Sequence, residues 1–233
     1  MGTQSRGIDQ VLIAQDLACR RAERLLFRDL NFTLRAGQAM LLRGPNGSGK
    51  SSLLRLLAGL LPAEAGTLTW RGQDVRKDRA GYRSDLAYLG HLDALKPQLL
   101  VQENLQFWAD LIGATVPVEN ALAKVGLGTC AAFPAQHLSA GQRRRFGLAR
   151  LLLKPVPIWL LDEPSTALDA SGQKLALDLI TRHRAAGGIA IISSHDDLAL
   201  PEVTTLVLGT GTPSPGNTGP GITAPGSARG AMT

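Results

Sequence analysis

Residues 44–51, which read Gly-Pro-Asn-Gly-Ser-Gly-Lys-Ser, have the composition and spacing of a phosphate-binding loop. Successive backbone N–H groups in such a loop can surround the phosphates of a nucleotide. Lys50 adds a positive charge, and Ser51 supplies a hydroxyl that can bind Mg²⁺. We therefore expect a nucleotide-binding segment made of the loop and the residue after it, namely Gly44, Pro45, Asn46, Gly47, Ser48, Gly49, Lys50, Ser51 and Ser52.

The segments on either side of this loop fit the same interpretation. Residues 39–42 form an apolar run of strand length, and leucines at helical spacing follow from Ser52. Phosphate would then lie at a helix N-terminus, where unpaired N–H groups and the macrodipole favour an anion. The alternative is a glycine-rich turn ahead of an ordinary helix, which the combination of strand, loop, Lys-Ser pair and helix disfavours.

Two adjacent carboxylates follow an apolar segment later in the chain. Residues 158–161 (Ile-Trp-Leu-Leu) predict a buried strand, and Asp162 and Glu163 come directly after it. Ligands of open α/β sheets bind at the carboxyl ends of strands. Asp162 is suited to bind Mg²⁺ together with Ser51, and Glu163 to polarise a water that attacks a phosphoryl group neutralised by Lys50. An ordinary strand end is the alternative, and the phosphate-binding loop upstream disfavours it.

A second candidate anion site lies at residues 138–142, which read Leu-Ser-Ala-Gly-Gln and precede an apolar helix. Ser139 offers a hydroxyl and a helix N-cap, Gly141 offers an unobstructed backbone N–H, and the helix contributes its positive end. Since one chain needs only one phosphate site, two sites suggest a nucleotide held between two copies. We interpret the three arginines of residues 143–145 as a solvated helix face, or one near phosphates, rather than a nucleic-acid site.

The order of apolar and polar segments predicts an α/β fold. Residues 11–14 and 30–34 predict an N-terminal β-rich layer, whereas residues 94–138 contain helical pieces interrupted by prolines and glycines. Strands and helices alternate after that insertion, which indicates a parallel sheet with helices on its faces. We expect one domain over residues 1–208 and a flexible Gly/Pro-rich tail over residues 209–233.

Composition limits the class of protein. The 233 residues carry a net charge of +6 and are 44% hydrophobic, enough for a substantial core. Cys19 and Cys130 are far apart without metal-type spacing, which fits a reducing, cytoplasmic setting and indicates neither disulfides nor zinc. Residues 1–10 lack the apolar core of a signal peptide, and no apolar run reaches the roughly 18 residues of a membrane-spanning helix. We expect a chain that does not cross a bilayer by itself.

These motifs, in this order, resemble those of the nucleotide-binding subunits of ABC transporters. Residues 138–142 correspond to the family signature Leu-Ser-Gly-Gly-Gln, and Asp162-Glu163-Pro164 follows it. Residues 165–169 (Ser-Thr-Ala-Leu-Asp) match the D-loop, and residues 193–196 (Ser-Ser-His-Asp) match the segment that carries the switch histidine. The resemblance covers about residues 11–208. It implies a P-loop NTPase fold of the ABC type, with an N-terminal β subdomain and a helical insertion, that dimerises around two MgATP molecules and hydrolyses them.

The resemblance also implies roles for single residues. His195 would contact the γ-phosphate and act with Glu163 and Lys50 in catalysis, while Asp169 would communicate across the dimer. The residues that would act on ATP bound by the opposite subunit are Ser139, Ala140, Gly141 and Gln142. His137 and His183 lack such a context, and we expect both at the surface.

Three positions depart from the family pattern. Ala140 replaces a glycine, which is harmless if its φ is negative and costly if a positive φ is required. His91 stands at the position of the Gln-loop glutamine, where an imidazole can still exchange hydrogen bonds with a metal-bound water. No aromatic residue is present where one usually stacks on adenine, and Arg20 or Arg21 could stack there instead.

More closely, the chain resembles the ATP-binding subunits of cytochrome c biogenesis transporters, also called haem exporters. The features shared with them are the short length, the Leu-Gly-His segment of residues 89–91 and the arginines after the signature. Relatives often carry glutamine where this chain has Leu92. The resemblance implies a peripheral subunit on the cytoplasmic face of a bacterial inner membrane. It would energise a multispanning membrane partner in c-type cytochrome maturation and bind no nucleic acid. Because the chain lacks a Cys-x-x-Cys-His segment, we predict that it does not itself hold haem.

Three alternatives remain open from the sequence. One is an exporter of the same type that moves another substrate. A second is an ABC ATPase without a transporter, although the long coiled-coil insertions or paired domains of such proteins do not fit within 233 residues. The third is a soluble P-loop kinase or nucleotide switch, in which residues 138–142 would have no purpose.

Overall fold

The computed structural model describes residues 10–91, 94–195 and 198–209, to which every structural statement below refers. Within these ranges, no helix is both long enough and apolar enough to span a membrane. The segment expected to be a flexible tail, residues 209–233, lies outside the described residues except for Gly209.

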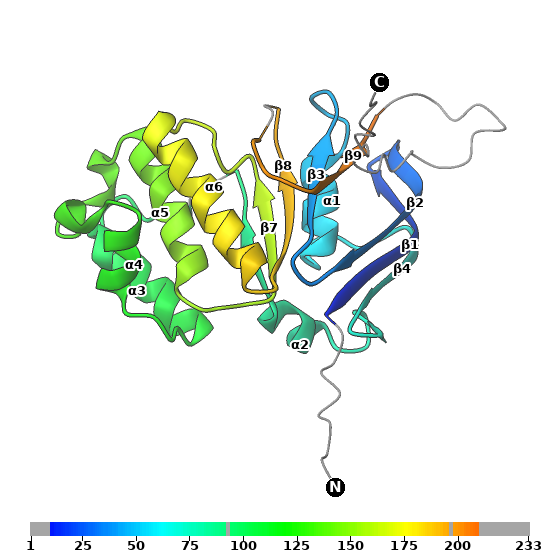
Figure 1. The fold of residues 1–233 in the computed structure, drawn as a ribbon, viewed down its shortest axis with the longest axis horizontal. Coiled ribbons are helices and arrows are strands. Elements are labelled where there is room, and N and C mark those ends of the chain that lie inside the picture. Colours follow the sequence, from blue (N-terminus) through cyan, green and yellow to red (C-terminus); the bar gives the residue numbers. More distant parts are fainter. Residues whose placement is uncertain (1–9, 92–93, 196–197, 210–233) are drawn as a thin grey trace, which may run out of the picture.

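A five-stranded parallel sheet in the order β6-β7-β8-β3-β9 forms the centre of the fold (Figure 1). Its strands are β3 (Ala39–Arg43), β6 (Leu86–Leu89), β7 (Ile158–Asp162), β8 (Ile189–Ser193) and β9 (Val203–Val207). Ser193 of β8 pairs with Asp162 of β7 on one side and with Leu42 of β3 on the other. The carboxyl ends of these three strands therefore meet at one edge of the sheet, where the phosphate-binding loop and the acidic pair begin.

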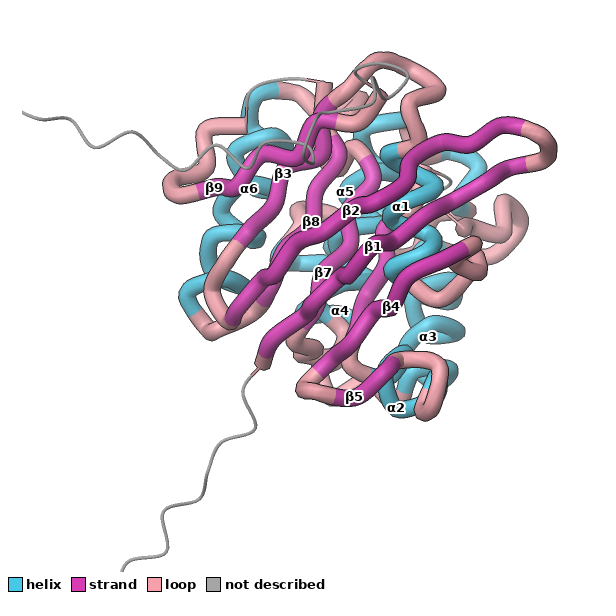
Figure 2. Tube along the Cα trace, turned by 90° about the vertical axis from the view of Figure 1, so that its right-hand side faces the viewer, coloured by secondary structure: helices cyan, strands magenta, loops and turns pink. Residues whose placement is uncertain are grey.

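A second, antiparallel sheet has the order β2-β1-β4-β5 and lies toward the viewer in Figure 2. Its strands are β1 (Val11–Arg21), β2 (Arg24–Arg35), β4 (Ala65–Trp70) and β5 (Gln73–Asp74). β1 and β2 form a long hairpin in which Arg21 pairs with Arg24 beside the turn, and the register shifts at several points along it. Such irregularities increase the local twist of a strand. The N-terminal β subdomain expected from the sequence is confirmed.

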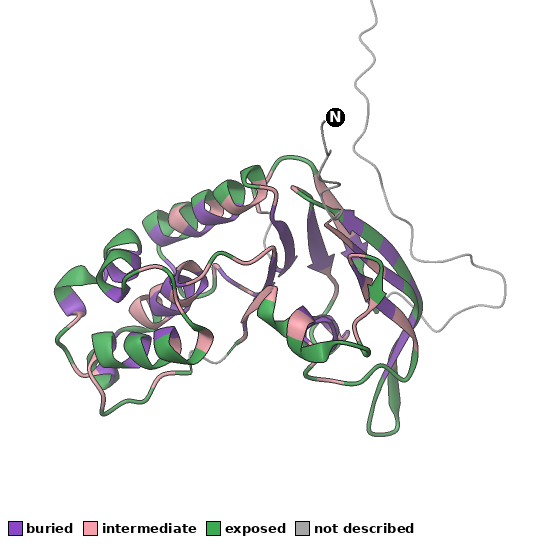
Figure 3. Cartoon of the chain, turned by 90° about the horizontal axis from the view of Figure 1, so that it is seen from below, coloured by how far each residue is buried: buried purple, intermediate pink, exposed green. Residues whose placement is uncertain are grey.

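Strand alternation explains why the parallel sheet has two apolar faces. Along β7, Ile158 and Leu160 belong to the core shared with α1 and the antiparallel sheet, whereas Trp159 and Leu161 belong to the core shared with α3, α5 and α6. These helices are α1 (Lys50–Leu57), α3 (Val101–Ile112), α5 (Ala140–Leu152) and α6 (Ala170–Ala185). All residues of β7 and β8 are buried, and the central strands are accordingly purple in Figure 3. α1 and α5 therefore lie on opposite faces of the sheet.

The helical insertion expected between the first and second halves of the fold is present and lies at one end of the molecule (Figure 1). It contains α3, α4 (Val118–Lys124) and two short 3₁₀ turns, Gly128–Cys130 and Ala135–His137. Buried apolar residues on α3, α4 and α5 share one core cluster, among them Leu105, Leu122 and Phe146. The insertion is thus packed onto α5, the helix that follows the signature segment.

Three short elements were not predicted from the sequence: β5, β9 and α2 (Arg79–Ser84). β9 contains two threonines and follows no clear turn signal, yet it pairs along its whole length with β3. α2 begins where the Asp78 side chain accepts a hydrogen bond from the N–H of Gly81 at 2.8 Å. β9 and α2 thus depend on contacts with other parts of the chain more than on the local sequence pattern.

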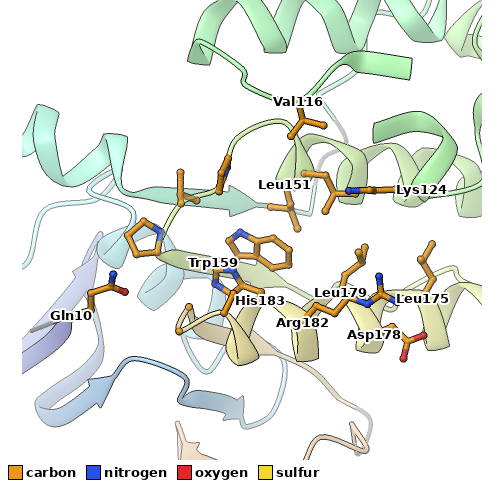
Figure 4. A pocket seen from close by; sticks show the side chains of 17 residues that line it. Gln10, Val116, Lys124, Leu151, Trp159, Leu175, Asp178, Leu179, Arg182 and His183 are labelled. Atoms are coloured by element: carbon orange, nitrogen blue, oxygen red, sulfur yellow. The ribbon is translucent and has the colours of Figure 1, made fainter. Parts of the chain in front are cut away.

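The prediction that His183 is an ordinary surface residue is wrong, whereas His137 is exposed as expected. The His183 ring stacks on Trp159 with centroids 4.1 Å apart and planes 5° apart. Its Nε2 donates to the carbonyl oxygen of Ile189 at 3.2 Å. Burial lowers the pKa of His183 to about 4, and the hydrogen bond to Ile189 opposes that change. The pair lies at a hollow of about 600 Å³ (Figure 4).

Candidate functional site

The loop of residues 44–51 joins β3 to α1, and its glycines allow the chain to turn tightly there. Gly44 has a φ of 139°, and a Cβ at this position would meet the carbonyl oxygen of Leu208 and lie 2.8 Å from Ser48 Oγ. Only glycine fits this backbone. The ammonium of Lys50 donates to the carbonyl oxygens of Gly44 at 2.7 Å and Pro45 at 3.2 Å. Lys50 is therefore held over the inside of the loop, where phosphate oxygens would be its partners.

A hollow of about 330 Å³ brings the loop together with Glu163 and the β1–β2 hairpin, whereas Asp162 does not line it. Its lining consists of Arg21, Arg24, Leu26, Asn46, Gly47, Gly49, Lys50, Ser51, Ser52 and Glu163. Gly44, Pro45 and Ser48 of the predicted segment lie outside this lining. Of the two arginines considered for base stacking, Arg21 lines the hollow, whereas Arg20 forms an ion pair with Glu64 at 3.0 Å.

Asp162 ends β7 and is 3% exposed. Its Oδ1 accepts a hydrogen bond of 2.6 Å from Ser193 Oγ, while its Oδ2 is buried without a hydrogen-bond partner among the described residues. A buried carboxylate oxygen without a partner is costly unless a cation or donor satisfies it. The oxygens of Asp162 and Ser51 are of the kind that suits Mg²⁺, which prefers few protein oxygens together with phosphate oxygens and water. Among the described residues there is no cluster of three or more His, Cys, Asp or Glu side chains that could hold a metal ion.

Glu163 has an unusual backbone conformation and lies next to His195. Its φ is 51°, in the left-handed region that glycine favours. Its Oε1 lies 3.2 Å from His195 Nε2, and its Oε2 accepts a hydrogen bond of 3.1 Å from Thr166 Oγ1. Two residues that the sequence places 32 positions apart are thus brought together at the edge of the hollow.

Ser193 has a structural role that was not predicted from the sequence. Its hydroxyl donates to Asp162 and accepts a hydrogen bond of 3.0 Å from the N–H of Glu163. Its position could have indicated this role, because Ser193 ends the apolar run that forms β8, the strand beside β7, and is paired with Asp162.

The signature segment begins α5. The Ser139 hydroxyl accepts from the N–H of Gln142 at 3.1 Å, and the Gln142 side chain accepts from the N–H of Ser139 at 2.8 Å, which forms a capping box. Ala140 is the first helical residue and is absent from the described non-glycine residues with positive φ, so alanine fits there without strain. A Cβ on Gly141 would lie 3.0 Å from the carbonyl oxygen of Ala167. None of residues 138–142 lines the hollow at Lys50.

The interpretation of residues 143–145 as a solvated helix face is wrong for Arg144, and the alternative of a face near phosphates stays a prediction. Arg144 is 5% exposed, and its guanidinium donates to backbone carbonyl oxygens on two other segments. Arg145 donates to Asp169 Oδ1 at 2.9 Å and to Ser171 Oγ at 2.8 Å. The overlooked signal is helical spacing, since Arg144 lies four and seven residues before the buried Leu148 and Leu151.

Two further predicted residues lie away from the hollow. Asp169 is the N-cap of α6 and accepts a hydrogen bond from Gly172 N–H at 2.9 Å. That bond, with those from Ser171 and Arg145, lowers the pKa of the Asp169 carboxyl. His91 follows β6 and is exposed, while Leu92 lies outside the described residues.

Comparison with known proteins identifies relatives of the chain. Residues 27–166 match the family model described as ABC transporter. The chain is 52% identical over 206 residues to the cytochrome c biogenesis ATP-binding export protein CcmA of Rhodospirillum rubrum, and the match covers 88% of each protein. It is 50% identical over 195 residues to the protein of that name from Nitrosococcus oceani, covering 84% of this chain and 90% of that one.

Solved structures agree with this. A structure named for an ABC transporter ATP-binding protein from Pyrococcus furiosus superposes with a TM-score of 0.74 at 27% identity, covering 85% of this chain and 97% of that one. Together with the sequence matches, this shows that the chain belongs to the ABC transporter family, and within it to the cytochrome c biogenesis ATP-binding proteins.

Proposed function

We propose that this chain is the ATP-hydrolysing subunit of a transporter that energises c-type cytochrome biogenesis, by haem export or release of a haem chaperone. The names of the relatives at 50% and 52% identity support this assignment. The observation that carries the hydrolytic role is the approach of Glu163 Oε1 to His195 Nε2, at 3.2 Å, beside a hollow that the phosphate-binding loop lines.

The roles of the residues follow from their positions. Lys50 neutralises charge on the β- and γ-phosphates, and Ser51 and Asp162 would hold Mg²⁺, which neutralises further charge. Glu163 accepts a proton from a water whose oxygen forms a bond to the γ-phosphorus while the bond to the ADP oxygen breaks. His195 orients the γ-phosphate and the water.

Dimerisation around two ATP molecules is supported by the separation of the two anion sites. Lys50 begins α1 on one face of the parallel sheet, whereas Ser139 caps α5 on the other. Residues 138–142 therefore act on ATP bound by a second copy. The fit of Ala140 into α5 without a positive φ keeps the N-terminus of that helix intact for this contact.

Contact with a multispanning membrane subunit is supported by the surface of the helical insertion. Phe107 is 47% exposed and Leu111 is 64% exposed, four residues apart on α3. Exposed apolar side chains on one helix face favour a protein partner. The chain would thus be a peripheral protein on the cytoplasmic face of the inner membrane, attached through that subunit.

The variant Glu163→Gln tests the hydrolytic role. The amide keeps the size of the side chain but cannot accept the proton, so we expect ATP binding to persist, turnover to fall by about 100-fold or more, and the ATP-bound dimer to accumulate. Normal turnover in this variant, measured on the full chain with its membrane subunit, would contradict the assignment.

Deleting the gene tests the biological role. We expect covalent haem attachment to periplasmic c-type cytochromes to be lost and to return with the wild-type gene but not with Glu163→Gln. Undisturbed attachment in the deletion strain would indicate an exporter of another substrate.

A further inference from the structure

We propose that Arg144 is a positioning residue that links the loop after β6 to the turn that carries Glu163, so that the position of this loop controls the geometry of the Glu163 carboxylate. The inference rests on the proposed function of Glu163 and adds a residue outside the motifs that hold ATP. Arg144 is the middle of the three arginines at residues 143–145 and is buried, with 5% exposure.

The hydrogen bonds of Arg144 join two segments that are far apart in the sequence. Its Nη1 donates to the Gly90 carbonyl at 2.9 Å, in the loop that leaves β6. Its other nitrogens donate to the carbonyls of Asp162, of Glu163 at 2.7 Å, and of Pro164 at 3.3 Å. A guanidinium has five N–H donors in one rigid plane, so it fixes both segments relative to each other. A lysine at this position has a single nitrogen and cannot reproduce the fork.

The backbone of Glu163 explains why such a link matters. Its φ of 51° is disfavoured for a residue with a Cβ and persists only when surrounding contacts hold it. Its N–H donates to Ser193 Oγ at 3.0 Å and to the Ser193 carbonyl at 3.1 Å, while its own carbonyl accepts from Arg144. Contacts on both sides of the residue thus maintain the strained conformation. With the Arg144 contact removed, the peptide relaxes and the carboxylate turns away from His195.

The other end of the link lies at the start of the segment that leads to the helical insertion. Gly90 directly precedes His91, and the chain continues from there to α3. A displacement of this loop pulls on the Gly90 carbonyl and, through Arg144, on the carbonyls of the Glu163 turn. Turnover is therefore sensitive to the position of the loop, whereas ATP affinity, set by residues 44–52, is not.

The test compares Arg144→Lys with Arg184→Lys in the full chain assembled with its membrane subunit. Arg184 is a matched control because it also donates to backbone carbonyls of separate segments, those of Gly37 at 3.0 Å and Pro201 at 2.8 Å. It lies on α6, away from the residues that line the nucleotide hollow. We expect both variants to melt at a lower temperature. We expect only Arg144→Lys to lose about tenfold or more in kcat, with KM for ATP changed by less than about twofold.

The proposal is overturned if Arg144→Lys has the kcat of the wild type, or if both variants lose kcat equally. If Arg144→Lys does not fold, Arg144→Gln is measured in the same way, with the same expectation and the same contradicting results. The proposed function and this proposal fail in different ways. Normal turnover in Glu163→Gln would contradict the role of Glu163 itself. An Arg144 variant with wild-type kcat beside an inactive Glu163→Gln would contradict only the link through Arg144.

Discussion

Protonation of His183 is expected to destabilise the fold in a defined pH range. Burial lowers its pKa from 6.5 to about 4, so the unfolded chain takes up a proton between these values while the folded chain does not. The contribution of the neutral His183 ring to the free energy of unfolding is fully present above about pH 6.5, falls as the pH drops, and is fully lost below about pH 4. A difference of about 2.5 pH units corresponds to about 3 kcal/mol, which is an upper value because the ring is partly exposed. Such a loss is large beside the roughly 5 to 15 kcal/mol of a typical domain.

The assay is urea unfolding of the wild type and of His183→Phe at several pH values from 4 to 7. Phenylalanine keeps a ring against Trp159 but cannot titrate. The variant also loses the hydrogen bond of His183 to Ile189, and because no titratable group remains at this position, that loss changes the free energy of unfolding equally at every pH. We expect the wild type to lose stability relative to His183→Phe as the pH falls. His137→Gln, at an exposed position, serves as the control and should follow the wild type. A difference between wild type and His183→Phe that does not depend on pH would refute the reasoning.

Two further predictions concern the nucleotide site and the signature helix. Asp162→Asn keeps the shape of the side chain but removes the buried charge, so we expect the Mg²⁺ concentration for half-maximal ATPase activity to rise about tenfold or more; an unchanged Mg²⁺ titration would contradict the proposed ligand. Gly141→Ala places a Cβ 3.0 Å from the Ala167 carbonyl, and we expect it to cost about 1 kcal/mol or more of stability and to lower turnover while ATP binding persists. Equal melting temperatures and turnover in the variant and the wild type would contradict that contact.

Much of the fold was predictable because its motifs stand at the ends of strongly patterned elements. The apolar runs before Gly44 and Asp162 predict β3 and β7, and the leucines after Ser52 predict α1. Parallel strands bring their carboxyl ends to one edge, so the meeting of the loop with Glu163 followed from the sequence alone. The approach of His195 to Glu163 rested on a family resemblance, and the structure supplies the distance between them.

The features that were missed depend on contacts between distant segments. β9 is a strand because β3 offers it an edge, and its own residues carry little signal. His183 is half-buried because Trp159, on β7, covers its ring. Arg144 is buried because the loop at Gly90 and the turn at Glu163 both present carbonyl oxygens to it. A charged or aromatic residue on a helix gives no local indication that such partners exist.

The central claim is that each ATP is hydrolysed between two copies, and Ser139→Asp tests it most directly. Aspartate is a good N-cap, so α5 is kept, while its charge repels the γ-phosphate of ATP bound by the other copy. Ser139→Asn is the neutral control of the same shape. We predict that Ser139→Asp binds ATP with the affinity of Ser139→Asn but has lost both the ATP-dependent dimer and turnover. Turnover by Ser139→Asp at the wild-type rate, from protein that sediments as a monomer, would contradict the account.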